Sequence, residues 1–206
     1  GAETLHAIGF AGEDGEAWEL RRGLAGLGCS TDHLHAASDR FTPTYMKPRD
    51  KNIVGLEGEH SRIDTKNRQT TPAAIEQAIM KSVTALAGEV DAVIVMDQAE
   101  ARDCGAVTGA VREHLAALAK TRSNDVFWAD SRRRIREYRS MIIKANEFER
   151  KSITKIFYRG AHCIFLAYDI TRLETFQNLS TWYKEVMDQS EPNVIVFLIG
   201  NKKDIE

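Results

Sequence analysis

A continuous apolar run near the C-terminus, residues 194–199, constrains the fold most strongly. Its six residues are all apolar, and a polar loop, residues 200–205, follows at once. Strands without polar alternation are typical of parallel sheets that helices cover on both faces. A second apolar run, residues 163–169, precedes it, and the intervening residues 173–187 have the pattern of a helix. The order of strand, helix and strand therefore predicts a parallel α/β fold for this part of the chain.

Asn201, Lys202 and Asp204 form an NKxD pattern directly after the apolar run. A carboxylate at Asp204 can accept two parallel N–H bonds from guanine N1 and N2, while Asn201 can meet the O6/N7 edge. The stem of Lys202 would lie along the plane of the base. Adenine would leave the carboxylate unpaired, so the pattern predicts a guanine-binding loop.

Several short stretches surround this loop. They are 151–162 (KSITKIFYRGAH), 168–171 (YDIT), 174–176 (ETF), Trp182 and 201–204 (NKKD). Together they resemble the Rab branch of the small GTPases, and the resemblance covers residues 150–206. It implies a Rossmann-like fragment of a P-loop GTPase that would use GTP with Mg²⁺. The sequence has no GxxxxGK[ST] loop to hold phosphates and no DxxGQ segment to position water, so we expect no GTP hydrolysis by this chain alone.

Residues 1–150 have a different pattern. A glycine-rich turn at residues 9–15 precedes a helical stretch with Trp18, Leu20, Leu24 and Leu27 at helical spacing, and Gly28 is its expected end. Two extended runs, 41–48 and 52–57, predict a small antiparallel flap. Pro72 predicts the first turn of a helix that has one apolar face.

A regular alternation follows that helix. Residues 91–97 predict a strand, 106–120 a helix, and 125–130 and 141–145 two further strands. This order is typical of βαβ units in a parallel, doubly wound sheet. An aspartate at the carboxyl end of such a strand either contacts a ligand or caps the following helix, and both roles stay open for Asp97 and Asp130. The glycine-rich turn likewise fits a tight βα connection or a ligand loop.

Six stretches of this region carry a second resemblance. They are the 9–15 turn, RxTxTxxK (40–47), DxxNR (64–68), DAVIVMD (91–97), ADSR (129–132) and KANEFE (144–149). Together they resemble ribokinase-like carbohydrate kinases of the PfkB type, and among these the heptose-phosphate kinases. The resemblance covers residues 1–149. It implies Mg²⁺ with ATP as cofactor and a sugar or sugar phosphate as substrate.

The kinase resemblance also implies roles for particular residues. Substrate binding would fall to Gly12, Asp14, Lys47 and Asp97, and organisation of Mg²⁺ and phosphate to Asn146 and Glu149. The GxGD segment that would supply the catalytic base and an anion hole is absent from this sequence, so no catalytic residue is assigned and enzyme activity stays uncertain.

The two resemblances meet at residues 149 and 150. We therefore expect a partial kinase domain (1–149) and a partial Rab-like segment (150–206). The fold class expected is α/β, a three-layer, doubly wound, mostly parallel sheet with a small antiparallel flap that continues into the GTPase fragment.

Composition excludes several functional classes. The 206 residues are 43% hydrophobic, and the net charge of −2 predicts no nucleic-acid partner. The basic run 132–136 fits a solvated helix start or a phosphate-side arginine cluster better than a nucleic-acid patch. Three widely spaced cysteines and no HxxxH or HExxH spacing predict neither a disulfide framework nor a metal site. The sequence shows no apolar run long enough for a membrane span, no signal peptide and no C-terminal cysteine for prenylation, so we expect a cytoplasmic chain without a membrane anchor.

Three hypotheses of function remain. The first is a truncated carbohydrate kinase that is fused to a Rab-like fragment and has little activity of its own. The second is a guanine-nucleotide-binding module, and the third is a non-catalytic hybrid α/β domain. Nucleotides and sugar phosphates are the expected ligands. We also expect self-association through unpaired sheet edges, because strands built to be central would lack neighbours.

Overall fold

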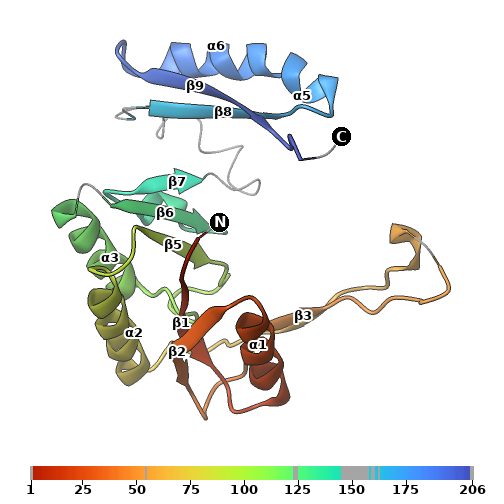
Figure 1. The fold of residues 1–206 in the computed structure, drawn as a ribbon, viewed down its shortest axis with the longest axis vertical. Helices are drawn as coiled ribbons and strands as arrows, with labels where there is room; N and C mark the ends of the chain where they lie inside the picture. Colours follow the sequence, from red (N-terminus) through yellow and green to blue (C-terminus); the bar gives the residue numbers. More distant parts are fainter. Residues whose placement is uncertain are drawn as a thin grey trace. The chain divides into compact units, whose positions relative to one another are not determined.

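The computed structural model describes residues 2–53, 55–122, 125–144, 158, 161 and 163–204 (Figure 1). The chain divides into two compact units, Gly1–Lys144 and Ala145–Glu206. Each unit has its own strands and helices, and each is described separately below.

The first unit begins with a βαβ motif. Strands β1 (Leu5–Ala11) and β2 (Cys29–Ala36) pair in parallel, and helix α1 (Gly15–Gly26) connects them. The carboxylate of Asp14 caps α1 by accepting a bond from the amide of Ala17 at 2.8 Å. Gly28 follows the helix with a φ of 69°, a backbone conformation that favours glycine. The predicted helix and its end are thus confirmed.

The antiparallel flap is present, but its second arm differs from the prediction. Strand β3 (Thr44–Met46) pairs with β4 (Ile63–Thr65), whereas residues 52–57 form no strand among those the structure describes. A short 3-10 turn, η1 (Leu56–Gly58), lies between the two arms. The partner of β3 is set by the hydrogen bonds of the ladder, in which Tyr45 stands opposite Asp64. The alternation of residues within one strand does not reveal this register.

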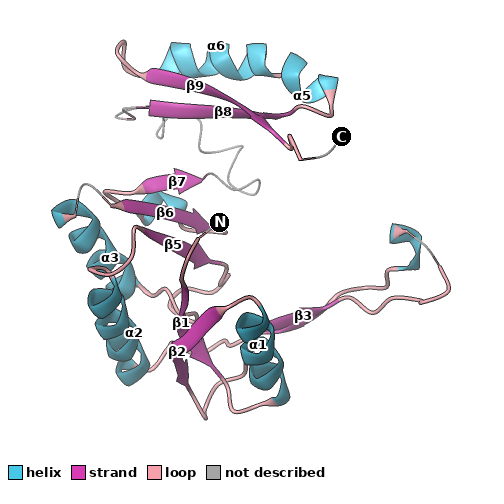
Figure 2. Ribbon diagram, viewed as in Figure 1, coloured by secondary structure: helices cyan, strands magenta, loops and turns pink. Residues whose placement is uncertain are grey.

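The rest of this unit is a parallel three-stranded sheet with two helices. Helix α2 (Ala73–Leu86) follows Pro72, and α3 (Gly109–Thr121) follows Thr108, whose hydroxyl accepts a bond from the amide of Val111. Strands β5 (Ala92–Asp97), β6 (Val126–Ser131) and β7 (Ile142–Lys144) pair in the order β5-β6-β7. A 3-10 turn, η2 (Ile135–Glu137), lies between β6 and β7 (Figure 2). The predicted strand-and-helix order is confirmed, although α3 begins three residues later than expected because Thr108 caps it.

The parallel strands of this unit do not form one continuous ladder among the described residues, contrary to the expected doubly wound sheet. β1 and β2 make one pair, and β5, β6 and β7 make a separate group. Helix α2 packs against β1 and β2 and also against α3. The core lies on one face of the three-stranded group, where Val95, Phe127 and Ala129 are buried.

The opposite face of that sheet is apolar and exposed. Ile94, Met96, Val126 and Ile142 lie on it, and each is at least 46% exposed. In a three-layer sheet, helices would bury these side chains. The three-layer expectation is therefore not met for this sheet by the residues that the structure describes. What the structure does show is a mixed α/β unit whose strands are mostly parallel.

The described residues of the second unit form one parallel pair of strands and two helices. Strand β8 (Cys163–Asp169) pairs in register with β9 (Ile195–Asn201), from Cys163 opposite Ile195 to Asp169 opposite Asn201. The predicted helix over 173–187 is divided at Asn178 into α5 (Leu173–Gln177) and α6 (Leu179–Gln189). Both helices pack against β8, and Leu179 and Val186 are the buried residues of α6.

One face of the β8–β9 pair is also exposed and apolar. Phe165 and Phe197 stand opposite each other in the register, and their rings stack with centroids 5.1 Å apart. Ile195 and Ile199 lie on the same face, and these four side chains are between 42% and 57% exposed. Such a surface agrees with the prediction of self-association, which stays a prediction.

Candidate functional site

The predicted guanine-binding residues lie at the carboxyl edge of the β8–β9 pair. Because the strands are parallel and Asp169 pairs with Asn201, the loops after both strands leave at the same edge. The amide of Ile170 donates to the carbonyl of Asn201 at 3.1 Å, which connects the two loops directly. Gly200 fits this close approach, since a Cβ there would lie 2.9 Å from the side chain of Ile170.

A tight turn orients Asn201 and Lys202. Lys202 has a φ of 67°, in the left-handed region that is uncommon for residues other than glycine. Its amide donates to Oδ1 of Asn201 at 2.9 Å. That bond leaves the side-chain amide nitrogen of Asn201 without a partner among the described residues, and this nitrogen is the donor that the O6/N7 edge of guanine requires.

Asp204 supplies the matching acceptor. It is exposed, and its carboxylate makes no hydrogen bond or ion pair with any residue that the structure describes. A carboxylate in water with both oxygens available can accept two parallel N–H bonds. The edge therefore offers one donor at Asn201 and a two-oxygen acceptor at Asp204, three residues apart in the chain.

Asp169 is a further member of this site that sequence reasoning missed. Its Oδ2 lies 2.7 Å from Nζ of Lys202, and its Oδ1 accepts bonds from the hydroxyl and the amide of Thr171. The ion pair fixes the side chain of Lys202 toward the loop after β8. The signal in the sequence was the DxT order of residues 169–171, which is typical of an Asx turn.

The pKa of Asp169 gives a direct test of this ion pair. The hydrogen bond from Lys202, followed by that from Thr171, lowers the pKa of Asp169 to about 2. A lowered pKa in the folded state means that the associated stability is present above the ordinary Asp value of about 3.9 and is lost as the pH falls toward 2. We expect Lys202→Met to raise the pKa of Asp169 toward its ordinary value in an NMR titration of the carboxyl carbon.

Lys203→Met is the matched control for that titration. Lys203 is an exposed neighbour that makes no ion pair with the described residues, so its loss should leave the pKa of Asp169 unchanged. Equal shifts in both variants would show that general positive charge, rather than the contact with Lys202, lowers this pKa.

The comparisons with known proteins concern this second unit. Residues 145–206 match the model of the Ras family. Ras-related protein RABA1c of Arabidopsis thaliana is 47% identical over 55 residues, which are 27% of this chain and 26% of that protein. Ras-related protein RabQ of Dictyostelium discoideum is 54% identical over 54 residues, 26% of each chain. The chain thus spans about a quarter of the length of these relatives.

The C-terminal segment therefore resembles a Rab-type GTPase, as predicted. The family match begins at residue 145, whereas the sequence analysis placed the join at 150. The carbohydrate-kinase interpretation of residues 1–149 has no support among these comparisons and stays a prediction.

Gly12 and Asp14, two of the residues predicted to bind sugar, connect the loop after β1 to Thr42. The carboxylate of Asp14 accepts bonds from the amide of Thr42 at 2.8 Å and from its hydroxyl at 2.6 Å, and the amide of Gly12 donates to the same hydroxyl at 2.9 Å. The hydroxyl of Thr42, followed by its amide, lowers the pKa of Asp14. A Cβ at Gly12 would lie 2.5 Å from the carbonyl oxygen of Arg40, so only glycine fits there.

Lys47 and Asp97, the other two residues predicted to bind sugar, contact neither Gly12 nor Asp14 and pair with Glu59 and Arg134. Lys47 follows β3, and its Nζ pairs with Glu59 at 3.1 Å. Asp97, at the carboxyl end of β5, is only 2% exposed. The structure therefore brings Gly12 and Asp14 together, whereas Lys47 and Asp97 have other partners. Asn146 and Glu149 lie outside the described residues, so the predicted Mg²⁺ and phosphate contacts are not tested.

A buried polar cluster surrounds Asp97. One carboxylate oxygen, Oδ2, accepts from the hydroxyls of Ser131 (2.9 Å) and Tyr138 (3.0 Å), and the other, Oδ1, pairs with Arg134 at 3.1 Å. Burial, followed by the negative charge of Asp97, raises the pKa of Tyr138. Both oxygens of Asp97 are thus engaged within the protein. The sequence analysis singled out Asp97 and the run 132–136 that contributes Arg134, but not the contact between them.

Two further features are absent from the described residues. No helix among them is both long and apolar enough to cross a membrane. Within the same residues, no group of three histidine, cysteine, aspartate or glutamate side chains is placed to hold a metal ion.

Proposed function

We propose that the C-terminal unit binds the guanine base of a nucleotide through Asn201, Lys202 and Asp204. The observation that carries the proposal is the placement of all three at one parallel-sheet edge, with the carboxylate of Asp204 unengaged. The match of residues 145–206 to the Ras family supports it. Asn201 would donate to O6 or N7, Asp204 would accept from N1 and N2, and the stem of Lys202 would lie against the base.

The sequence contains no glycine-rich phosphate loop of the GxxxxGK[ST] type, and this shapes the expected binding. Most of the binding free energy should come from the base. Guanosine, GMP and GDP should therefore bind with affinities within a few-fold of one another, whereas a phosphate-dominated site would favour GDP strongly.

Calorimetric titration of the full chain tests this proposal. We expect GDP to bind more tightly than ADP by roughly 5- to 150-fold, because a two-bond base contact is worth about 1–3 kcal/mol of discrimination. Guanosine against adenosine should show the same ratio. Equal affinity for the two bases would contradict the proposal, as would the absence of binding by a chain whose circular dichroism shows it to be folded.

A further inference from the structure

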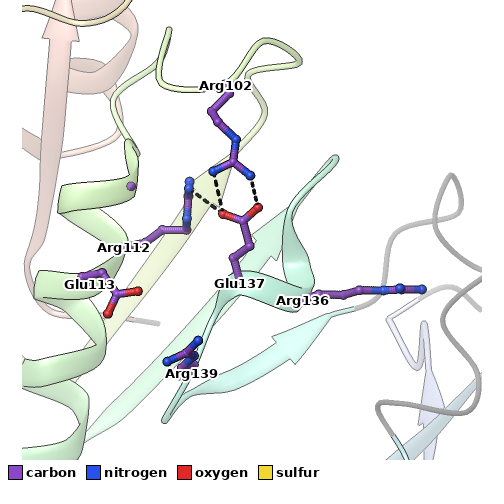
Figure 3. Close-up of a pocket in the computed structure, with 7 residues that line it drawn as sticks. Arg102, Arg112, Glu113, Arg136, Glu137 and Arg139 are labelled. Carbon is purple, nitrogen blue, oxygen red and sulfur yellow. Dashed lines mark hydrogen bonds and ion pairs between the residues drawn. The ribbon is translucent and has the colours of Figure 1, made fainter.

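Outside the guanine site, the first unit contains a pocket whose lining is rich in arginine. Its volume is about 350 Å³, and it lies between the first turns of α3 and the segment around η2. The lining residues are Arg102, Gly109, Arg112, Glu113, Arg136, Glu137 and Arg139 (Figure 3). Four arginines against two glutamates give the lining a formal excess of two positive charges. A concave surface that concentrates one sign of charge attracts ions of the opposite sign.

Arg112 is a fixed donor in the wall of the pocket. Its side chain is 3% exposed, and its guanidinium donates to Glu137 at 2.7 Å. The same guanidinium donates to the carbonyl of Val107 at 3.4 Å and lies 5.9 Å from the ring centre of Tyr138. A guanidinium held in this way loses little side-chain freedom when an anion binds.

Glu137 does not cancel the positive charge of the pocket. Its carboxylate is shared between Arg112 and Arg102 (Figure 3). Arg112 also lies 4.0 Å from Asp97, which pairs with Arg134 as well, so these three arginines and two carboxylates together carry one positive charge. Arg139 adds a second charge. It is exposed and forms no hydrogen bond or ion pair with any described residue.

Two amides at the N-terminus of α3 already have partners within the protein. The amide of Gly109 already donates to Asp103, and the amide of Val111 donates to Thr108. The excess positive charge of the pocket lining comes from its arginine side chains. Arginine forks match the paired oxygens of phosphate, which distinguishes such a site from a diffuse cationic surface.

From these contacts we propose that the pocket binds the phosphate group of a small anionic ligand between Arg112 and Arg139. The pocket is larger than a phosphate ion and has the size of small-ligand sites, so it has room for an organic group attached to the phosphate. Binding would link α3 to the η2 segment and would stabilise the first unit by mass action.

The test uses the full chain with inorganic phosphate as the probe, at constant ionic strength maintained with chloride. We expect a saturable rise of the thermal midpoint and a matching calorimetric isotherm. Arg139→Gln should weaken the affinity at least roughly ten-fold, because a charge-assisted bond is lost. Glu113→Gln should strengthen it, because this variant removes a negative charge from the same lining.

Arg22→Gln is the matched control. Arg22 is an exposed arginine on α1 that pairs with Glu19 and lies outside the pocket lining, so its loss should change the phosphate affinity less than two-fold. Equal weakening by the two arginine variants would overturn the proposal in favour of diffuse charge, and so would an unsaturable response of the unaltered chain.

A second probe distinguishes a site for phosphate esters from a site for inorganic phosphate. Glycerol 2-phosphate should compete with inorganic phosphate and bind at least as tightly if the site accepts esters. Weaker binding of the ester than of the free ion would assign the pocket to inorganic phosphate. Failure of both probes would leave the guanine proposal untouched, because that site lies in the other unit.

Discussion

Replacing Asp204 by asparagine is expected to change the base preference of the chain from guanine to xanthine. The carboxylate of Asp204 is exposed and unengaged at the edge where Asn201 and Lys202 also lie. With guanine, the asparagine side chain would place an NH₂ donor against an N–H donor, so one of the two bonds would be lost. Xanthine presents a carbonyl oxygen at position 2 and N1–H beside it, which an amide satisfies with one donor and one acceptor.

The size of this effect follows from the number of bonds exchanged. A good two-bond base contact is worth about 1–3 kcal/mol, so GDP affinity should fall roughly 5- to 150-fold in Asp204→Asn and xanthosine diphosphate affinity should rise over the same range. Competition calorimetry with the two nucleotides measures both changes in one experiment.

Asp188→Asn is the control for that experiment. Asp188 is an exposed carboxylate on α6, away from the loops that follow β8 and β9, so its amide variant should bind both nucleotides like the unaltered chain. An Asp204→Asn chain that keeps its guanine preference would show that Asp204 does not contact the base.

Replacing Asp97 by alanine is expected to lower the free energy of unfolding of the first unit by about 3–5 kcal/mol, because a buried ion pair loses one partner. Asp97 and Arg134 are 2% and 7% exposed, and their side chains lie 3.1 Å apart. The alanine variant would leave the Arg134 guanidinium buried without its carboxylate. It would also remove the acceptor of the Ser131 and Tyr138 hydroxyls.

Urea unfolding followed by circular dichroism measures this loss, with amide hydrogen exchange of β5 and β6 as the local readout. Asp97→Asn retains acceptor and donor capacity and should cost less, so it remains measurable if the alanine variant does not fold. Asp125→Ala is the matched control, because the pair of Arg122 and Asp125 is partly exposed to solvent and its loss should cost about 1 kcal/mol. A loss below that value for Asp97→Ala would contradict the structural role of the cluster.

The contacts of Asp97 also bear on the kinase hypothesis. Asp97 was predicted to bind substrate because it ends a parallel strand, and the sequence left helix capping as the alternative. In the structure, both carboxylate oxygens of Asp97 are engaged by buried partners. A ligand would have to displace one of these bonds, which makes a mainly structural role the simpler expectation for this residue.

Local signals were sufficient for most of the elements. Pro72 before an apolar helical face predicts α2, and the spacing from Trp18 to Leu27 with Gly28 after it predicts α1. Such signals depend on residues within one or two turns, so they are readable without the fold. The prediction placed the second arm of the flap at residues 52–57, whereas β3 pairs with β4. This pairing depends on a register between distant residues, which local signals do not contain.

The sequence alone determined the order of most strands and helices and singled out the loop that we propose to bind guanine. It did so because hydrophobic periodicity and a polar loop after an apolar strand are properties of neighbouring residues. Only the tertiary structure decided that Asp169 meets Lys202, that Arg134 and Tyr138 enclose Asp97, and that Arg112 and Arg139 line one pocket. These contacts join side chains from different elements, and their geometry is set by packing and register, which no short stretch of sequence specifies.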